Sequence, residues 1–348
     1  MLSVNKSRRA VEALLATFLD QKVADSTTIH PSYTRLVSHV RATAMAGGKR
    51  IRPQLIFLAY GDYSEQITKV AAAHELLHMA LLVHDDIIDR DNTRHNQPTI
   101  HAAYDQHYEP YLPDTAERKH FSQSAALLAG DLLISFAYEL MSQAELSTTQ
   151  QRHATSLMSR AIFEVAGGEL LDTEAPFITE EFEPETVYRY KTASYSFIAP
   201  LMTGAHLSPR KLDESSLRGL EEYATNLGIA YQIRDDILGV FGDEEKTGKS
   251  ATGDLREGKQ TFLTHHFKQV MTTDQQALFD QTFGNVDANE SSFDTLRTAM
   301  QAAGSLEATN SLNAHYTKKA LAGLTSISHP ALREDLLEFA TTLLKRDK

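Results

Sequence analysis

The sequence predicts an all-α protein, and three observations lead to that prediction. The stretch 68–89 contains neither Gly nor Pro and places apolar residues on nearly every helical face, which is typical of a helix buried inside a bundle. Alternating β-branched runs and a strand–helix–strand rhythm, which would indicate a sheet, are missing. Only 10 Pro interrupt the 348 residues. We therefore expect one large α-helical domain over residues 1–348.

The expected elements follow in chain order, and their breaks are recognised by turn-forming residues. The stretch 68–89 is the first long helix, and three later stretches rich in Ala and Leu continue the pattern: 122–146, 153–171 and 213–241. Polar segments with Pro or Gly separate these helices. The expected loops are 91–119, 172–186, 242–261 and 284–292. None resembles a long flexible linker, so no domain boundary is expected.

Composition and charge exclude several classes of function. The chain carries 34 Lys and Arg against 46 Asp and Glu, a formal net charge of −12, which argues against a nucleic-acid partner. With no Cys, the chain cannot form disulfides, thiolate metal sites or iron–sulfur clusters. No apolar run reaches the ~20 residues of a membrane-spanning helix, and residues 1–21 lack a secretory signal. We expect a cytoplasmic protein without an integral membrane segment.

The most informative motif is the acidic sequence HDDIIDRD at residues 84–91. On a continuing helix Asp85 and Asp89 share one face, where their carboxylates repel unless a cation lies between them. Asp86 adds negative charge, and the helix dipole also disfavours an acidic C-terminal turn. Oxygen ligands without Cys favour Mg²⁺ before Ca²⁺, because proteins commonly hold Mg²⁺ through one or two carboxylates and substrate phosphates. A merely solvated helix end is the alternative.

A second acidic pair, Asp235 and Asp236, ends the apolar stretch GIAYQI further along the chain. One helical turn later the residue is Gly239, so this pair offers fewer carboxylates than the first motif. A single DD pair is weak evidence of function. Two pairs that each follow a buried helix predict a multi-metal site able to hold a diphosphate.

Cations that could bind a diphosphate directly occur in the motif GGKRIRP at residues 47–53. Lys49, Arg50 and Arg52 follow a flexible Gly pair, and Pro53 can open a helix. Lys supplies a point charge, and Arg supplies a fork that matches phosphate oxygens. An ordinary basic helix start is the alternative. Other candidate cations are Arg94, Lys191, Lys249 and Lys259.

Seven stretches of the chain resemble, in the same order, the trans-isoprenyl diphosphate synthases (polyprenyl synthetases), and in particular the geranylgeranyl diphosphate synthases. The stretches are GGKRIRP, HMALLVHDDIID, TRHNQPT, LLAGD, GGELLD, YKTASYSF, and GIAYQIRDDILGVFGD continuing to GKSATGDLREGKQT. The resemblance implies a helical bundle around a deep central cavity, a homodimer, and head-to-tail condensation of isopentenyl diphosphate with an allylic diphosphate. In this reaction the isopentenyl double bond attacks the allylic carbon as diphosphate departs, and a proton is then lost.

The resemblance also implies roles for individual residues. It assigns Mg²⁺ binding to Asp85, Asp89 and Asp235, with three ions bridged through the substrate diphosphate, while Asp86 and Asp236 support these ligands. The family's site for the allylic diphosphate implies contacts from Arg94, Lys191 and Lys249, and the other substrate-binding residues are Thr192, Lys259 nearby and Gln232 near the water shell of the metal. The residues counted as catalytic are these five aspartates and Lys191. Its isopentenyl diphosphate site implies contacts from Lys49, Arg52, His78 and His95. For His78 alone, a core position on an apolar helix is the alternative.

Three positions depart from the family's pattern. His95 stands where the family has a second Arg after Arg94, which weakens one isopentenyl diphosphate contact or makes it pH-dependent. Gly239 replaces an Asp, a change that some active members share. Glu169 replaces the usual Gln and adds a negative charge near the expected cavity. The sequence offers no account of this last change.

Product length depends in this family on the bulk below the first acidic motif. The residues five and four before Asp85 are Ala80 and Leu81, and neither is aromatic. Family members that stop at fifteen carbons usually carry an aromatic there, so we expect a C20 product. Longer C30–C40 products and a C15 product are alternatives. Phe136 and Tyr138 are either a lower floor or ordinary core residues.

Other functions are less consistent with the motifs. A terpene cyclase usually has an Asn/Ser/Glu-type second motif and lacks a site for isopentenyl diphosphate, unlike this chain. A non-catalytic partner subunit of a two-chain prenyl synthase typically loses aspartates, and both DD pairs are present here. A helical binding or structural protein would leave two acidic clusters unexplained. We therefore expect a transferase of alkyl groups other than methyl.

Overall fold

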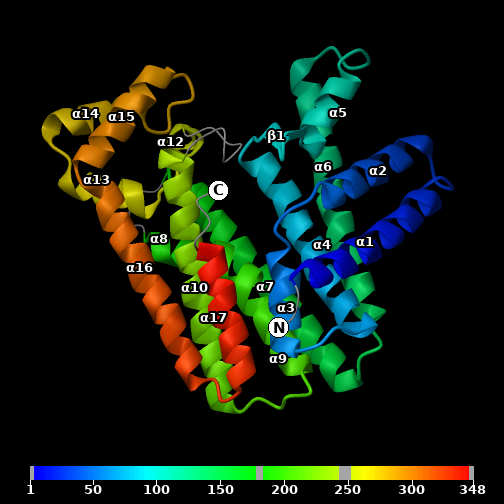
Figure 1. Ribbon diagram of the computed structural model, residues 1–348. Coiled ribbons are helices and arrows are strands. Elements are labelled where there is room, and N and C mark those ends of the chain that lie inside the picture. The colour runs from blue at the N-terminus through cyan, green and yellow to red at the C-terminus, as the bar shows by residue number, and fades with distance from the viewer. Residues whose placement is uncertain (1–3, 178–182, 243–251, 345–348) are drawn as a thin grey trace. The chain divides into compact units, whose positions relative to one another are not determined.

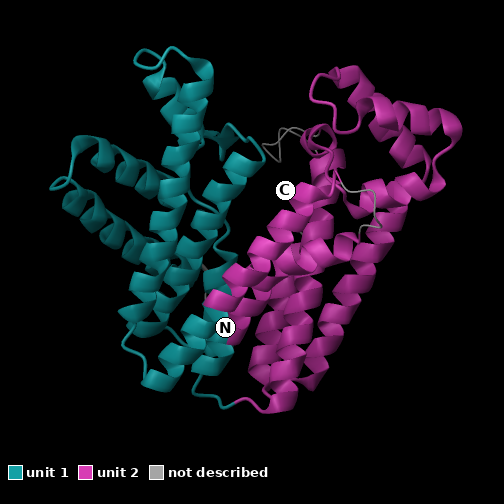
Figure 2. Cartoon of the chain, turned by 180° about the vertical axis from the view of Figure 1, so that it is seen from behind, with its two compact units in different colours: residues 1–158, 203–211 teal, residues 159–202, 212–348 magenta. Residues whose placement is uncertain are grey.

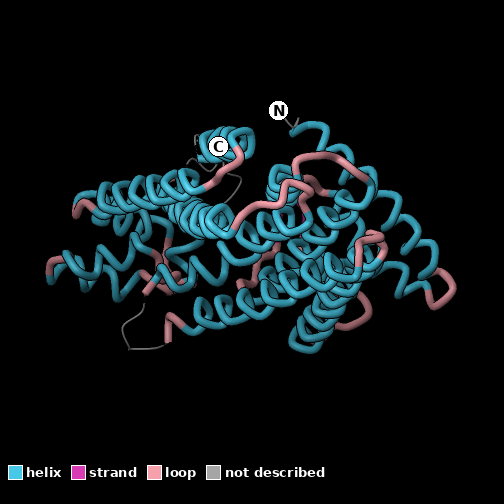
Figure 3. Tube along the Cα trace, turned by 90° about the horizontal axis from the view of Figure 1, so that it is seen from below, coloured by secondary structure: helices cyan, strands magenta, loops and turns pink. Residues whose placement is uncertain are grey.

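The computed structural model describes residues 4–177, 183–242 and 252–344, and this part of the chain is almost entirely helical (Figure 1). Extended structure within these ranges is limited to one antiparallel ribbon of two short strands, β1 (Thr93–Arg94) and β2 (Gln97–Pro98). The Cα trace in Figure 3 likewise shows helices joined mostly by short connections. The predicted all-α class is confirmed.

The chain divides into two compact units, which Figure 2 shows in different colours: residues 1–158 with 203–211, and residues 159–202 with 212–348. Two helices, α7 (Thr148–Glu174) and α9 (Ala199–Leu207), contribute residues to both units. Two expectations from the sequence remain predictions: that residues 1–348 form a single domain, and that the helices surround a deep central cavity.

The first unit is built on two long helices, α4 and α6, which pack along each other. Its helices are α1 (Val4–Ser26), α2 (Pro31–Met45), α3 (Ile51–Tyr60), α4 (Glu65–Ile88), α5 (Ile100–Tyr108) and α6 (Thr115–Ser142). Ser64 caps α4, because its side chain accepts a hydrogen bond from the backbone N–H of Ile67, and Asp114 caps α6 in the same way. Helix α4 buries residues on all its faces, as the pattern of 68–89 predicts.

Residues 91–119, which we expected to be a loop, contain regular structure. His95 and Asn96 both have a positive φ (52° and 58°), which suits the two-residue turn between β1 and β2. Helix α5 follows, and its Tyr104 is buried beside Tyr108 and Phe121. The prediction was wrong here because polar and Pro residues dominate the composition, and one short helix shows too few turns to reveal its period.

The second unit is organised around α10, which packs along α16 and along the π-helix η1. Its elements are α8 (Pro184–Val187), η1 (Tyr188–Ile198), α10 (Glu214–Phe241), α12 (Gly253–Glu257), α13 (Phe262–Val270), α14 (Thr273–Thr282), α15 (Glu290–Ala302), α16 (Ser305–Gly323), η2 (Leu324–Ser326) and α17 (Pro330–Leu344). Asp213 caps α10 by accepting from the backbone N–H of Ser216. Gly228 lets α10 approach η1 closely, since a Cβ there would lie 2.5 Å from the Cβ of Ala193.

Helix α6 is the one described helix that is long and apolar enough to cross a membrane by length and composition. Half of its apolar window is buried inside the structure. A core helix of a bundle has the same composition, because it contacts apolar neighbours on most faces. The feature is therefore weak evidence for a membrane segment.

Candidate active site

The C-terminal end of α4 carries the first acidic motif. Asp85 and Asp86 lie in the last turn of the helix, and Asp89 is its C-cap residue. A carboxylate oxygen of Asp85 and one of Asp89 lie within 4.8 Å of each other, so the two side chains share a face as their spacing predicts. Carboxylate oxygens at this separation form a donor set suited to a hard cation.

The guanidinium of Arg94 lies across this acidic motif. Its Nε is 2.5 Å from Oδ1 of Asp86, and its Nη2 is 3.4 Å from Oδ2 of Asp85 and 3.5 Å from Oδ2 of Asp91. Burial raises the pKa of Asp86 to about 7, although the charge of Arg94 opposes this rise. Three carboxylates share one guanidinium in these contacts, so the motif attracts further positive charge.

The motif GGKRIRP forms the connection from α2 into α3. Gly47 and Gly48 have φ values of 109° and 123°, and Arg50 has a φ of 51°. The Arg50 side chain is fully buried, and its Nη1 lies 2.9 Å from Oε1 of Glu75 on α4. Lys49 is exposed. Arg50, one of the three cations expected to meet a phosphate, instead points into the core and holds the connection in place.

Positive charges surround His78 on α4. Desolvation lowers the pKa of His78 well below its ordinary value, and the charges of Arg52 and Arg94 lower it further. Arg50 and His95 act on the same ring. The first unit therefore brings four of the predicted substrate contacts together: Arg52, His78, Arg94 and His95. A neutral imidazole there can still donate one N–H to a phosphate oxygen.

The two positions expected to influence product length lie in the same helix. Ala80 is fully buried and Leu81 is half-buried. On α6, Phe136 packs edge-on against Phe18 of α1 with ring centroids 5.7 Å apart, and the Lys22 ammonium lies 5.3 Å from the Phe136 centroid. These contacts support the interpretation of Phe136 as a core residue.

The second acidic motif lies in the last turns of α10. Asp235 is exposed, whereas Asp236 is buried. The Gln232 side chain donates to Oδ1 of Asp236 at 2.8 Å, and the Tyr188 hydroxyl donates to Oδ2. Burial raises the pKa of Asp236 well above its ordinary value. Asp235 is thus accessible to a ligand, while Asp236 is held by neighbouring side chains.

Gly239 lies against a carboxylate from another helix. A Cβ at this position would lie 2.3 Å from Oδ2 of Asp254 on α12, so a side chain here would displace that carboxylate. The negative charge of Asp254 also raises the pKa of Asp236. Lys259 lies 4.0 Å from Oδ1 of Asp254, and Lys249 lies outside the described residues. The second motif therefore has a further acidic neighbour that its own sequence lacks.

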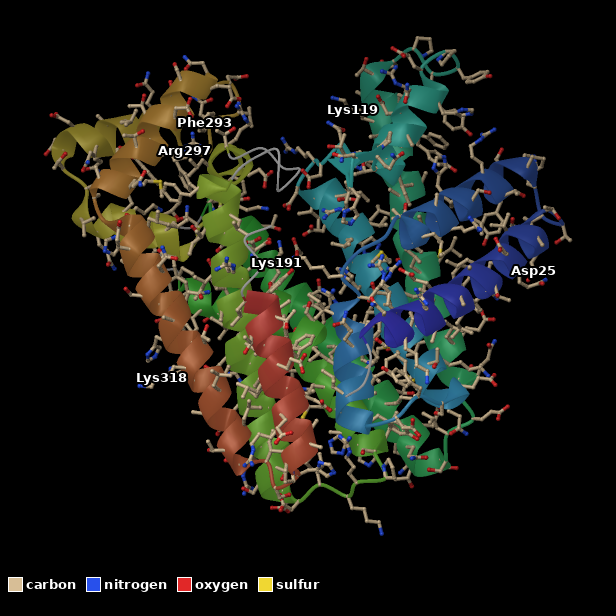
Figure 4. The ribbon with its side chains drawn as sticks, viewed as in Figure 1. Asp25, Lys119, Lys191, Phe293, Arg297 and Lys318 are labelled. Atoms are coloured by element: carbon tan, nitrogen blue, oxygen red, sulfur yellow. The ribbon has the colours of Figure 1, made fainter. Side chains whose placement is uncertain are left out.

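Lys191, labelled in Figure 4, lies on η1. Its Nζ is 2.6 Å from Oδ2 of Asp172 and 3.1 Å from Oε2 of Glu169. The next residue, Thr192, donates its hydroxyl hydrogen to Oε1 of Gln232 at 2.7 Å. Thr192 and Gln232 are therefore brought together with Asp236 of the second acidic motif, whereas the neighbouring Lys191 pairs with the two carboxylates of α7.

Four polar residues at these sites are not predicted by the sequence motifs. Asp172 and Asp254 had a usable signal, because they lie inside the motifs GGELLD and GDLREGKQT. Glu75 and Tyr188 had none, since Glu75 lies in a stretch whose pattern predicts only a buried helix and Tyr188 lies between the expected loop 172–186 and the motif YKTASYSF. Their roles depend on partners distant in sequence.

Comparisons with known proteins agree with this chemistry. The polyprenyl synthetase family model matches residues 34–300. The geranylgeranyl diphosphate synthase of Sulfolobus acidocaldarius is 32% identical over 298 residues, which cover 81% of this chain and 82% of that protein. The octaprenyl diphosphate synthase of Escherichia coli is 30% identical over 308 residues, 87% of each chain.

The structure is also similar to a solved one. A crystal structure of the geranylgeranyl pyrophosphate synthase from Corynebacterium glutamicum, complexed with isoprenyl diphosphate and magnesium, matches with a TM-score of 0.91 and 29% identity. The match covers 99% of this chain and 100% of that one. The chain therefore belongs to the polyprenyl synthetase family and is a trans-prenyltransferase that acts on isoprenyl diphosphates.

Proposed function

We propose that the chain condenses isopentenyl diphosphate with an allylic diphosphate in a Mg²⁺-dependent reaction and that its main product is geranylgeranyl diphosphate (C20). The end of α4 carries the proposal, because Asp85 and Asp89 present carboxylates on one face and Arg94 contacts the same motif. Asp235 supports it from α10, where its side chain is exposed.

The donor chemistry of both motifs fits Mg²⁺, since every proposed ligand is a carboxylate oxygen. Asp85, Asp89 and Asp235 would hold the metal, which we propose to be three ions bound together with the substrate diphosphate. When bound, Mg²⁺ supplies electrostatic stabilisation for charge that builds on the departing diphosphate. Asp86 orients Arg94 through its 2.5 Å contact, and Asp236 orients Gln232.

The cationic residues divide between the two substrates. On the isopentenyl diphosphate we place Lys49, Arg52, His78 and His95, of which His78 donates a hydrogen bond from a neutral ring. On the allylic diphosphate we place Arg94, Lys191, Thr192, Gln232, Lys249 and Lys259. Preorganised donors of this kind stabilise developing negative charge at little reorganisation cost. The charge cluster around His78 supports the first group, and the hydrogen bond from Thr192 to Gln232 supports the second.

The proposed product length depends on Ala80. Its small side chain leaves no aromatic bulk five residues before Asp85, and Phe136 is engaged with Phe18. The names of the relatives include both a geranylgeranyl and an octaprenyl diphosphate synthase, so a longer product is the competing outcome.

We further propose that this single-domain chain works as a homodimer in the cytoplasm. Helix α6 supports dimerisation, because the adjacent residues Leu127 and Leu128 are 49% and 58% exposed, and a second copy could cover such an apolar pair. Sedimentation of the protein with both leucines changed to Glu should show monomers where the unchanged chain shows dimers.

The direct test is to incubate purified protein with Mg²⁺, labelled isopentenyl diphosphate and farnesyl diphosphate, and then to resolve product lengths. We expect mainly C20 product, no turnover after chelation by EDTA, and a rate about a hundredfold lower for Asp85→Asn. Products of C30 or longer would refute the length assignment. No incorporation with any allylic primer by folded protein would favour a non-catalytic partner subunit.

A further inference from the structure

Lys191 is shared between two carboxylates of one helix. Its ammonium contacts Asp172 at 2.6 Å and Glu169 at 3.1 Å. The three side chains are 16–19% exposed, so water screens their charges less than it screens surface ion pairs. The formal charges of these three groups sum to −1, although Lys191 is the group proposed to attract a diphosphate.

Backbone packing holds this arrangement in register. A Cβ on Gly168 would lie 2.2 Å from the backbone nitrogen of Lys191, so α7 and η1 are in direct contact at that point. Glu169 and Asp172 are three residues apart on α7 and therefore share the face that meets η1. Close packing of the two backbones thus fixes the point from which the Glu169 side chain reaches Lys191.

We propose that Glu169 restrains Lys191 electrostatically and so lowers the affinity of the enzyme for its allylic diphosphate. This inference rests on the proposed role of Lys191 in binding that substrate. An incoming diphosphate must compete with Glu169 for the ammonium, because both anions bind the same positive charge. Glu169 is therefore a residue that sets affinity through Lys191 and takes no part in the bond-making step.

The chemistry of the side chain explains why the charge itself is decisive. A Gln at position 169 has the same length as Glu and can still accept a hydrogen bond from Lys191, but it carries no charge. Asp172 would continue to hold Lys191 in place. The unusual Glu in GGELLD thus keeps the geometry of the pair while making the site more negative.

The first experiment compares Glu169→Gln with Glu164→Gln. Glu164 is a matched control, because it lies on the same helix and forms its own 2.7 Å ion pair with Arg160. We expect Glu169→Gln to lower KM for farnesyl diphosphate about fivefold, the effect of roughly 1 kcal/mol in a charge pair. KM for isopentenyl diphosphate and kcat should stay within about twofold, and Glu164→Gln should match the unchanged protein.

A second measurement removes the dependence on turnover. Isothermal titration of inorganic diphosphate in the presence of Mg²⁺ should show tighter binding to Glu169→Gln, by about the same fivefold. In a Lys191→Gln background the gain should vanish if Glu169 acts through the ammonium. If turnover is absent in the unchanged protein, the proposed function fails while this titration still tests Glu169.

Two results would overturn the inference. One is a KM for farnesyl diphosphate that is unchanged or higher in Glu169→Gln, with diphosphate binding to match. The other is a gain that persists fully after Lys191→Gln, because the carboxylate would then act on the ligand directly.

Discussion

Arg50 and Glu75 form an ion pair that is removed from solvent, with Nη1 2.9 Å from Oε1 and exposed side-chain fractions of 0% and 2%. Arg50 comes from the connection after α2, and Glu75 comes from the middle of α4, the helix that ends in the first acidic motif. Arg50 also donates to the carbonyl of Ala44 at 2.9 Å. The pair therefore ties the basic connection carrying Lys49 to α4.

Changing Glu75 to Gln should destabilise the protein strongly. It removes the nearest counterion of the buried Arg50 charge and leaves only the more distant carboxylate of Glu12, 3.7 Å from Nε, which costs about 3–5 kcal/mol of unfolding free energy. Glu65→Gln is the control on the same helix, because Glu65 is 81% exposed and pairs with Lys69 at the surface, where about 0–1 kcal/mol is expected. Urea unfolding measures both variants, and equal losses would contradict the special role of the buried pair.

His74 should make the stability of the protein depend on acid pH. Burial, with a smaller contribution from Arg52, lowers the pKa of His74 to about 4. Below pH 6.5, the ordinary pKa of the ring, His74 takes up a proton in the unfolded state but stays neutral in the folded state. The free energy of unfolding therefore falls as the pH drops from 6.5 toward 4. The loss from this group is about 3 kcal/mol.

The measurement for His74 is urea unfolding between pH 7 and 4. His74→Leu should make the free energy of unfolding less dependent on pH by the contribution of this one group, because no side chain remains there to take up a proton. His315→Gln, which changes an exposed side chain, should keep the slope of the unchanged protein. A His74→Leu curve parallel to that of the unchanged protein would show that the ring titrates normally in the fold.

Gly168→Ala should disrupt the contact between α7 and η1. The new Cβ would lie 2.2 Å from the backbone nitrogen of Lys191, and neither backbone can move away cheaply, so we expect a loss of about 1–3 kcal/mol. Gly167→Ala is a matched control with no atom within 4 Å of its Cβ, and it should be neutral or stabilising by about 0.4–1 kcal/mol. Thermal unfolding compares the two, and similar Tm values would refute the packing argument.

Tyr188→Phe should change the Mg²⁺ dependence of catalysis as well as lower the stability of the protein. It removes the hydroxyl that donates to Asp236 and leaves Oδ2 of a buried carboxylate without that partner. We expect kcat to fall about tenfold and the Mg²⁺ concentration for half-maximal rate to rise. Tyr223→Phe, which removes a buried hydroxyl that donates to the carbonyl of Leu336 at 2.8 Å, should lower stability but leave the Mg²⁺ dependence unchanged. The prediction fails if both variants show the same Mg²⁺ dependence.

Local features of this protein could be predicted from the sequence. The stretch 68–89 predicted a buried helix, and α4 spans Glu65–Ile88. The spacing of Asp85 and Asp89 predicted two carboxylates on one face, and their oxygens lie within 4.8 Å. Both predictions depend only on the period of a helix, which nearby residues determine. The short α5 was missed because its period is too brief to detect among polar residues.

The sequence by itself determined the all-α class, the family and the residue types of the two acidic motifs, since these follow from composition, period and motif order. Only the tertiary structure decided which of these residues face a partner. Arg50 turns toward Glu75, Asp254 takes the space beside Gly239, and Glu169 shares Lys191 with Asp172. Each of these contacts joins residues from different helices or loops. Their pairing depends on how the elements pack, which no local spacing in the chain encodes.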